Sequence, residues 1–132
     1  MRLWNGQANK SGARRDVRQT MRRGEVRWYE FAAPDKRRPV LILTRTSALR
    51  FLTGVTVAPL TSTIRTIPSE VLLTPPEDGV LNVCAVNLDN IQTVQKAQLG
   101  SLLTTLSAVR MREVEQALCF ALGMDRLLTL GN

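Results

Sequence analysis

The pattern of apolar and polar positions along the chain predicts a series of short strands. Glu25–Phe31 is rich in valine and aromatic residues, and Pro39–Thr44 is a continuous apolar run whose length and branched side chains favour a strand buried on both faces. Pro59 lies within a third run and indicates a strand edge, a strand end or a bulge. The expected later strands are Val55–Leu60, the region near Glu70–Leu73, Cys84–Leu88 and Ile91–Val94.

Only the end of the chain has a clear helical pattern. Ser107 is suited to cap a helix that runs to about Leu122, and Gly123 can adopt the left-handed conformation that often follows a helix. The side chains expected on the apolar face of this helix are Val114, Leu118, Ala121 and Leu122. Many short strands followed by a terminal helix predict a mainly β fold with some α (α+β), a compact antiparallel barrel-like sheet with helices packed on it.

Residues 1–20 differ in composition from the rest of the chain. They contain Asn, Gly, Ser and scattered charges without an apolar period, which is typical of a disordered extension. Residues 21–132 are expected to form a single domain, because the length suits one domain and there are no repeats. No apolar run approaches the roughly 20 residues of a membrane span, and no apolar stretch follows the basic start, so a cytoplasmic protein is expected.

Positive charge is concentrated in the first half of the chain. The formal net charge is +7, and residues 1–65 hold 14 of the 18 Lys and Arg but only four of the 11 Asp and Glu. A basic half joined to a neutral or acidic half is typical of a protein that binds a polyanion. From charge alone, a basic surface that is merely solvated is an equally good interpretation.

The absence of histidine excludes several kinds of active site. Without histidine, a Ser-His-Asp or Cys-His site is impossible, and an ordinary zinc site lacks ligands. Phosphate-loop and dinucleotide-binding glycine motifs are also absent, and the few acids do not pair as in a two-metal nuclease. Cys84 and Cys119 lie in apolar surroundings and are expected to be buried, reduced thiols. No metal and no cofactor are therefore expected.

Arginines and hydroxyls remain as candidate functional groups. Lys36-Arg37-Arg38 lies where a turn enters a buried strand, and Thr61-Ser62-Thr63, with Arg65 close behind, follows another strand. Arginine binds phosphate through two parallel hydrogen bonds, and hydroxyls can support it. The alternative is that these segments are a charged turn and a polar loop. Trp28 is expected in the core more than as a surface on which bases stack, a role that Tyr29 could also take.

Five segments occur in an order that resembles one protein family. They are Met21–Val26, a basic residue and a glycine before the first strand, then Arg38–Leu43, Val57–Thr63, Val86–Val94 and Leu106-Ser107 opening the last helix. Together they are similar to the MazF/PemK toxins of toxin-antitoxin systems over about Met21 to Gly123. Ala32–Arg37 departs from the family, because it is short and lacks a Gly-Ser-Glu loop that is often present there and takes part in base recognition.

The resemblance implies a fold and an activity. The fold would be a CcdB/MazF-type SH3-like antiparallel barrel with a C-terminal helix, forming a homodimer through its sheet. The activity would be metal-independent, sequence-specific cleavage of single-stranded RNA, neutralised by a cognate antitoxin of the MazE type. The family's catalytic arginine before proline corresponds to Arg38, and its catalytic threonine after the third strand corresponds to Thr61.

The expected reaction is an attack of the RNA 2′-hydroxyl on the adjacent phosphate, giving 2′,3′-cyclic phosphate and 5′-hydroxyl ends. The residues expected to contact the RNA backbone are Lys36, Arg37, Ser62, Thr63 and Arg65. The main alternative is a non-catalytic, CcdB-like toxin that binds a protein such as DNA gyrase. A plain nucleic-acid-binding barrel without catalysis is a second alternative.

Overall fold

The computed structural model describes residues 20–32 and 37–130. Lys36 and nearly all of the expected disordered extension lie outside these ranges. The elements, in chain order, are β1 (Glu25–Glu30), β2 (Arg37–Ile42), α1 (Thr46–Leu49), β3 (Gly54–Thr61), β4 (Glu70–Leu73), β5 (Cys84–Asn87), a 3-10 turn η3 (Leu88–Asn90), β6 (Gln92–Gln95), a 3-10 turn η4 (Lys96–Gln98), β7 (Leu102–Thr105), α2 (Ala108–Ala121) and α3 (Arg126–Leu130).

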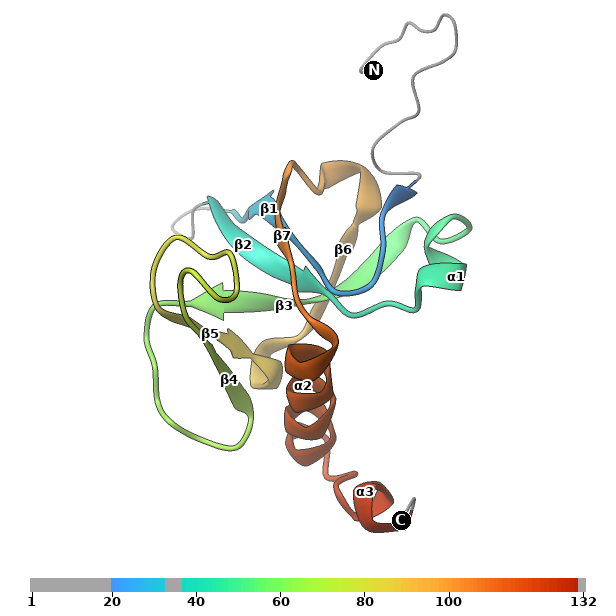
Figure 1. Ribbon diagram of the computed structural model, residues 1–132. Coiled ribbons are helices and arrows are strands. Elements are labelled where there is room, and N and C mark those ends of the chain that lie inside the picture. Colours follow the sequence, from blue (N-terminus) through green and yellow to red (C-terminus); the bar gives the residue numbers. More distant parts are fainter. Residues whose placement is uncertain (1–19, 33–36, 131–132) are drawn as a thin grey trace, which may run out of the picture.

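The strands form a strongly curved antiparallel sheet with the order β4-β5-β3-β2-β1-β7, and α2 stands against one end of it (Figure 1). β3 is the central strand. It pairs with β2 along one side, and along the other side it pairs first with β6 and then with β5. This arrangement confirms the expected mainly β, barrel-like architecture with a C-terminal helix.

Pro59 does not mark a sheet edge, so that interpretation of the third strand is wrong. Pro59 pairs with Val40 of β2 on one side. On the other side it falls between Gly54–Val57, which pairs with β6, and Leu60–Thr61, which pairs with β5. The ladder is interrupted at this point, and a proline is tolerated there because it has no N–H to donate.

Two apolar clusters stabilise the sheet from opposite faces. Val40 and Ile42 belong to one cluster, and Leu41 between them belongs to the other. All three side chains are fully buried, which confirms that β2 is buried on both faces. Alternation along the strand explains this division, because successive side chains point to opposite sides of a sheet.

Helix α2 begins and ends as the sequence predicts. The Ser107 hydroxyl accepts a hydrogen bond from the backbone N–H of Arg110, and Gly123 has φ +71°. The face that packs on the sheet is formed by Met111, Val114 and Ala117, with Leu118 and Ala121 partly buried beside them. Leu122 is 52% exposed, so its assignment to the buried face is wrong.

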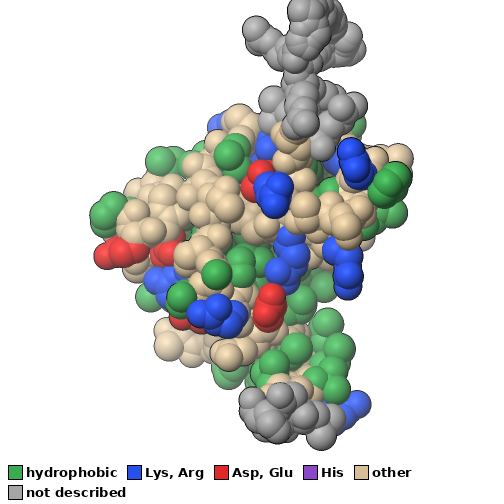
Figure 2. Space-filling view, turned by 45° about the vertical axis from the view of Figure 1, so that its right-hand side comes forward, with side chains coloured by type: hydrophobic (Ala, Val, Ile, Leu, Met, Phe, Trp, Pro, Cys, Tyr) green, Lys and Arg blue, Asp and Glu red, His purple; other side chains and the backbone are tan. Residues whose placement is uncertain are grey.

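Three elements were not predicted from the sequence pattern: α1, β7 and α3. β7 pairs with β1 through an irregular register and leads directly into α2. Apolar side chains gather beside α3, at the lower end of the view in Figure 2. Exposed apolar residues there are Phe120, Leu122, Met124, Leu127 and Leu128. Within the described residues, no helix is long and apolar enough to cross a membrane.

A buried ion pair lies inside the sheet, on β1. The Arg27 guanidinium donates to the Glu25 carboxylate at 2.9 Å, and its side chain is 3% exposed. Arg27 also donates to the carbonyl oxygen of Gly100 at 3.0 Å, which connects β1 to the segment before β7. Because its guanidinium is buried and bonded to a carboxylate and a carbonyl oxygen, Arg27 has a structural role.

Candidate active site

An open groove of about 360 Å³ lies at the end of the sheet where β2 begins and β3 ends. We call it the strand-end groove. One side consists of Arg37, Arg38 and Pro39 at the start of β2, with Trp28 of β1 beside them. The end of β3 and its loop contribute Leu60, Thr61, Ser62 and Thr63, and the wall before β5 contributes Val80, Leu81, Asn82, Val83 and Cys84. Leu103 of β7 completes the lining.

The pairing of β2 with β3 relates Arg38 to Thr61. Val40 stands opposite Pro59 in the observed register. Extending this antiparallel register by two residues sets Arg38 opposite Thr61, so both belong to the same face of the sheet. Residues that are 23 positions apart in the sequence are thereby neighbours at the border of the groove. The guanidinium carbon of Arg38 lies 5.9 Å from the centre of the Phe31 ring. Arg38 is also the cross-strand partner of Tyr29, so these two side chains share one face of the sheet.

The Thr61 hydroxyl is fixed by its own loop. Its oxygen accepts a hydrogen bond from the backbone N–H of Thr63 at 3.0 Å. A hydroxyl has one proton to donate in addition to its acceptor positions. The bond from Thr63 therefore orients the oxygen and leaves the proton available to an incoming acceptor such as a phosphate oxygen.

Arg37 and Trp28 lie on the other face of the strand ends. The guanidinium carbon of Arg37 is 4.2 Å from the centre of the Trp28 ring, which is a close cation–π contact. Trp28 is only half-buried and lines the groove, so its assignment to the core is wrong. Arg37 and Trp28 together present a cation and an aromatic ring at the groove.

The structure brings together five of the seven residues singled out from the sequence, Arg37, Arg38, Thr61, Ser62 and Thr63. Arg65 does not line the groove. Its backbone N–H donates to Glu70 at 2.9 Å, and its guanidinium lies 3.8 Å from the same carboxylate. Lys36 lies outside the described residues.

Cys84 lines the groove as a half-buried free thiol. Burial, with a smaller contribution from the negative charge of Asp78, raises the pKa of the Cys84 thiol above its ordinary value. The thiol is therefore protonated at neutral pH and is a poor nucleophile. Cys119 is also free and half-buried, so both thiols are unpaired as expected but less buried than expected.

The acids and amides near η3 have local structural partners. Asn87 accepts from the backbone N–H of Asp89 at 3.0 Å, and the Asp89 carboxylate accepts from the Ser69 hydroxyl. These bonds give Asn87 and Asp89 a structural role in the turn at η3. The described residues that line the strand-end groove include no Asp, Glu or His. Its chemistry therefore depends on guanidinium groups, hydroxyls and one amide, that of Asn82.

Sequence reasoning overlooked the Asn82 wall. The segment after the Asp78-Gly79 turn has no periodic pattern, and nothing local indicates that it faces β2. Only the pairing of β5 with β3 brings it to the groove, because Ala85 stands opposite Thr61.

The fold and the groove define the class of the protein: a small antiparallel barrel whose open strand ends carry arginines and hydroxyls. Residues 22–122 match the family described as PemK-like, MazF-like toxin of type II toxin-antitoxin system. The chain belongs to this family.

Curated and solved relatives agree with this assignment. The chain is 43% identical over 104 residues to a probable endoribonuclease, MazF5, of Mycobacterium tuberculosis, covering 79% of this chain and 94% of the relative. The structure of M. tuberculosis toxin MazF-mt6 matches with a TM-score of 0.70 and 35% identity, covering 76% of this chain and 98% of that one. A mycobacterial endoribonuclease solved with its cognate antitoxin matches with a TM-score of 0.70 and 33% identity, covering 79% and 96%. The expected MazF-type fold is confirmed.

Proposed function

We propose that this chain is a toxin endoribonuclease that cleaves single-stranded RNA without a metal ion. The observation that carries the proposal is the strand-end groove, which is lined by both Arg38 and Thr61 and by no described carboxylate. Phosphodiester RNA is a polyanion, and a groove of this composition attracts it. The names of the relatives, which are endoribonucleases, support the same activity.

The nucleophile in the proposed reaction comes from the RNA itself. The 2′-hydroxyl loses its proton to solvent and attacks the adjacent phosphorus in line, a new 2′-O–P bond forms, and the bond to the 5′-oxygen breaks as that oxygen takes up a proton. The products are a 2′,3′-cyclic phosphate and a 5′-hydroxyl. No protein nucleophile is required, which agrees with the absence of histidine and with the raised pKa of Cys84.

Arg38 and Thr61 divide the stabilisation of the transition state. The Arg38 guanidinium binds the negative charge that develops on the phosphoryl oxygens. Thr61 donates its hydroxyl proton to one non-bridging oxygen, with its orientation fixed by Thr63. Donors aimed at developing charge are worth about 2.7–4 kcal/mol each. We assign Arg38 first to electrostatic stabilisation and second to protonation of the leaving oxygen.

The remaining sequence candidates serve to hold the RNA backbone. Arg37, Ser62 and Thr63 line the groove beside the proposed catalytic pair. Lys36 directly precedes Arg37 in the chain, and Arg65 follows the hydroxyl loop with its side chain 57% exposed. We propose that these five residues bind phosphates on either side of the cleaved bond, Lys36, Arg37 and Arg65 through their charge and Ser62 and Thr63 through hydrogen bonds.

We further propose that the toxin is a cytoplasmic homodimer controlled by a cognate antitoxin of the MazE type. The exposed apolar side chains of the single chain, including Phe120 and Leu127, are a surface that a second copy would cover. An acidic segment of the antitoxin would occupy the cationic groove and exclude RNA. Sedimentation of the purified chain tests the dimer.

A CcdB-like toxin that binds a protein such as DNA gyrase is the less favoured alternative. The family match and the curated relatives all point to RNA cleavage. A protein-binding toxin would also have no need for a neighbouring Arg38 and Thr61.

The proposal is tested by incubating the protein in excess EDTA with a mixed-sequence single-stranded RNA and mapping the fragment ends. We expect discrete cuts with cyclic-phosphate and 5′-hydroxyl ends. Arg38→Ala and Thr61→Val should each abolish or strongly reduce them, whereas Thr61→Ser, which keeps the hydroxyl, should retain cleavage. Absence of cleavage by a folded wild-type dimer would contradict the proposal and favour the protein-target alternative.

A further inference from the structure

The strand-end groove has a wall that the proposed catalytic pair does not use. It follows the buried Val80 and consists of Leu81, Asn82 and Val83, all of them exposed. Leu81 is 68% exposed and Val83 is 48% exposed, so two neighbouring apolar side chains lie on the surface at the groove. The wall therefore has the composition of a contact surface, with one amide between two apolar side chains.

Asn82 is suited to recognise a nucleobase. A side-chain amide carries two N–H donors beside a carbonyl acceptor, and it can form two hydrogen bonds with the edge of one base. The guanidiniums and hydroxyls of the groove suit phosphates, and Asn82 is the one amide among the described residues that line it. The apolar neighbours Leu81 and Val83 would exclude water from the base and strengthen those hydrogen bonds.

The stacked pair of Arg37 and Trp28 complements this wall. Bases of single-stranded RNA stack on aromatic rings and on the planar guanidinium of arginine. The Arg37 guanidinium carbon lies 4.2 Å from the centre of the Trp28 ring, so cation and ring are in contact, and both residues line the same groove as Asn82. The groove thus combines a stacking surface with a hydrogen-bonding edge, beside the border where Arg38 and Thr61 lie.

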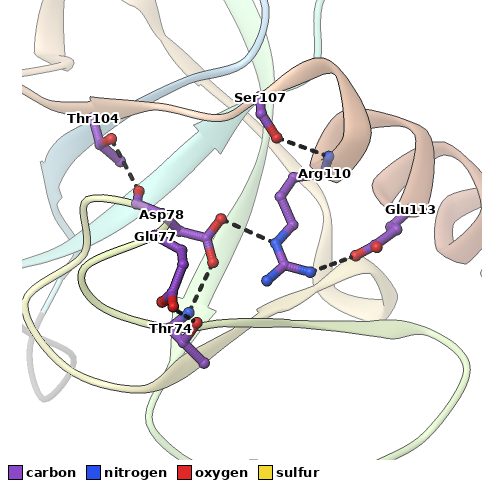
Figure 3. A network of polar contacts seen from close by, with 7 residues as sticks. All are labelled: Thr74, Glu77, Asp78, Thr104, Ser107, Arg110 and Glu113. Carbon is purple, nitrogen blue, oxygen red and sulfur yellow. Dashed lines mark hydrogen bonds and ion pairs between the residues drawn. The ribbon is translucent and has the colours of Figure 1, made fainter.

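A polar network centred on Asp78 holds the loop that leads into the wall (Figure 3). The buried Asp78 carboxylate accepts from the backbone N–H of Thr74 at 2.9 Å and from the Arg110 guanidinium at 3.0 Å. The Thr104 hydroxyl donates to the Asp78 carbonyl at 3.0 Å. Gly79 follows with φ +72°, and a Cβ there would lie 2.3 Å from the Thr104 hydroxyl oxygen. The loop is therefore held from both sides, four residues before Asn82.

Arg110 reaches this loop from helix α2 and does not line the strand-end groove. Its second partner is Glu113, at 2.9 Å on the same helix. Burial disfavours the charge of Asp78, but the hydrogen bonds from Arg110 and Thr74 outweigh it and hold the pKa of that carboxyl below its usual value. Asp78 and Arg110 are therefore both charged at neutral pH.

We propose that Asn82 reads the edge of a base next to the cleaved phosphate, and that Arg110 is a positioning residue that holds the Asn82 wall through Asp78. The inference rests on the proposed ribonuclease function and names the part of the groove that selects the RNA sequence. It also assigns to helix α2 a role in specificity, although α2 itself does not line the groove.

The test measures sequence preference with an RNA library randomised over the cut site. Asn82→Ala should reduce the preference for one base at one position by about 5- to 100-fold, since a bidentate contact discriminates on that scale. Preferences at the other positions should stay unchanged. Asn82→Asp, which can only accept, should shift the preferred base at that same position. A uniform loss of rate at every sequence would overturn the role of Asn82.

Arg110→Met tests the positioning role. It should weaken preference at the same position as Asn82→Ala, and the double variant should lose little more than either single one. Arg112→Met makes the same change at an exposed arginine of α2, and Glu113→Gln removes only the other partner of Arg110. Both controls should retain the wild-type preference. Additive losses in the double variant, or equal losses in the controls, would overturn the positioning role.

The two proposals fail in different ways. If wild-type protein cuts no RNA, the proposed function fails and this inference with it. If the wild type cuts, Arg38→Ala does not, and Asn82→Ala cuts with the wild-type preference, then only this inference fails. Each variant is first shown to be folded by circular dichroism at the assay temperature.

Discussion

Arginines occupy two contrasting settings in this molecule. Arg27 and Arg110 each donate to a buried carboxylate, those of Glu25 and Asp78, at 2.9 and 3.0 Å. In the strand-end groove, by contrast, Arg37 lies against the ring of Trp28, and no described Asp or Glu is part of the groove lining.

The contrast shows how one residue type supports either the fold or the activity. A guanidinium paired with a carboxylate contributes to stability, and the carboxylate charge weakens its attraction for an anionic ligand. A guanidinium held by an aromatic ring keeps its full charge and its planar shape available to a phosphate or a base. Variants of the two kinds of arginine should therefore differ in what they damage.

The largest expected effect is on stability, at the paired arginines. Arg27→Met removes the cation from the buried Glu25 carboxylate and should lower the free energy of unfolding by about 3–5 kcal/mol. Urea denaturation measures this change. Arg23→Met, at the more exposed pair with Glu115, is the control and should cost less than Arg27→Met, because the two side chains of that pair are 31% and 50% exposed. Equal losses at both sites would remove the distinction between buried and exposed arginine pairs.

The next effect is on catalysis, at the groove. Arg38→Lys keeps the positive charge but loses the planar fork of donors. The single-turnover cleavage rate should fall by about 100-fold or more, with the free energy of unfolding changed by less than about 0.5 kcal/mol. A lysine variant that cleaves at the wild-type rate would show that charge alone is sufficient at this position.

A smaller effect is expected on RNA binding. Arg37→Met should weaken binding of an uncleavable RNA, with a 2′-deoxynucleotide at the cut site, and should lower the slope of log affinity against log salt by about one. Fluorescence anisotropy across a salt series gives the slope. Arg112→Met, far from the groove on the exposed side of α2, should leave it unchanged.

The smallest effect is a pH dependence at the paired side. The pKa of Asp78 is lowered from 3.8 on folding, so its ion pair stabilises the protein above pH 3.8, and this stabilisation is lost as the pH falls through the folded pKa. Asp78→Asn should thus be less stable than wild type at pH 7, with a gap that narrows in acid. Thermal melts at pH 7 and pH 3 measure it, and an unchanged gap would contradict the assignment.

The sequence predicted β4 and the two ends of α2, because these depend on residues close together in the chain. β4 was predicted at its observed bounds, and Ser107 and Gly123 end α2 through bonds and backbone angles within a few residues of themselves. β7 was missed, because Leu102–Thr105 has no strong apolar alternation and becomes a strand only by pairing with β1. Trp28 was misplaced, because alternation puts it on the same face as the buried Val26 but does not show that this face opens into a groove at the strand ends.

The candidate catalytic residues were named from the sequence, but their proximity was not established by it. A motif names Arg38 and Thr61, whereas the β2–β3 register relates them in space. Arg65 illustrates the reverse case, since its place in the hydroxyl loop suggested the groove and its side chain instead approaches Glu70.

The sequence by itself determined the short strands, the terminal helix, the family and the types of residue available for chemistry, because these depend on periodicity, capping and motifs within short segments. Only the tertiary structure decided that the Asn82 wall faces Arg37 across a groove, and that Arg110 reaches Asp78 from 32 positions away. Such contacts form where strand pairing and burial bring distant segments together, and no local pattern encodes which segments will meet.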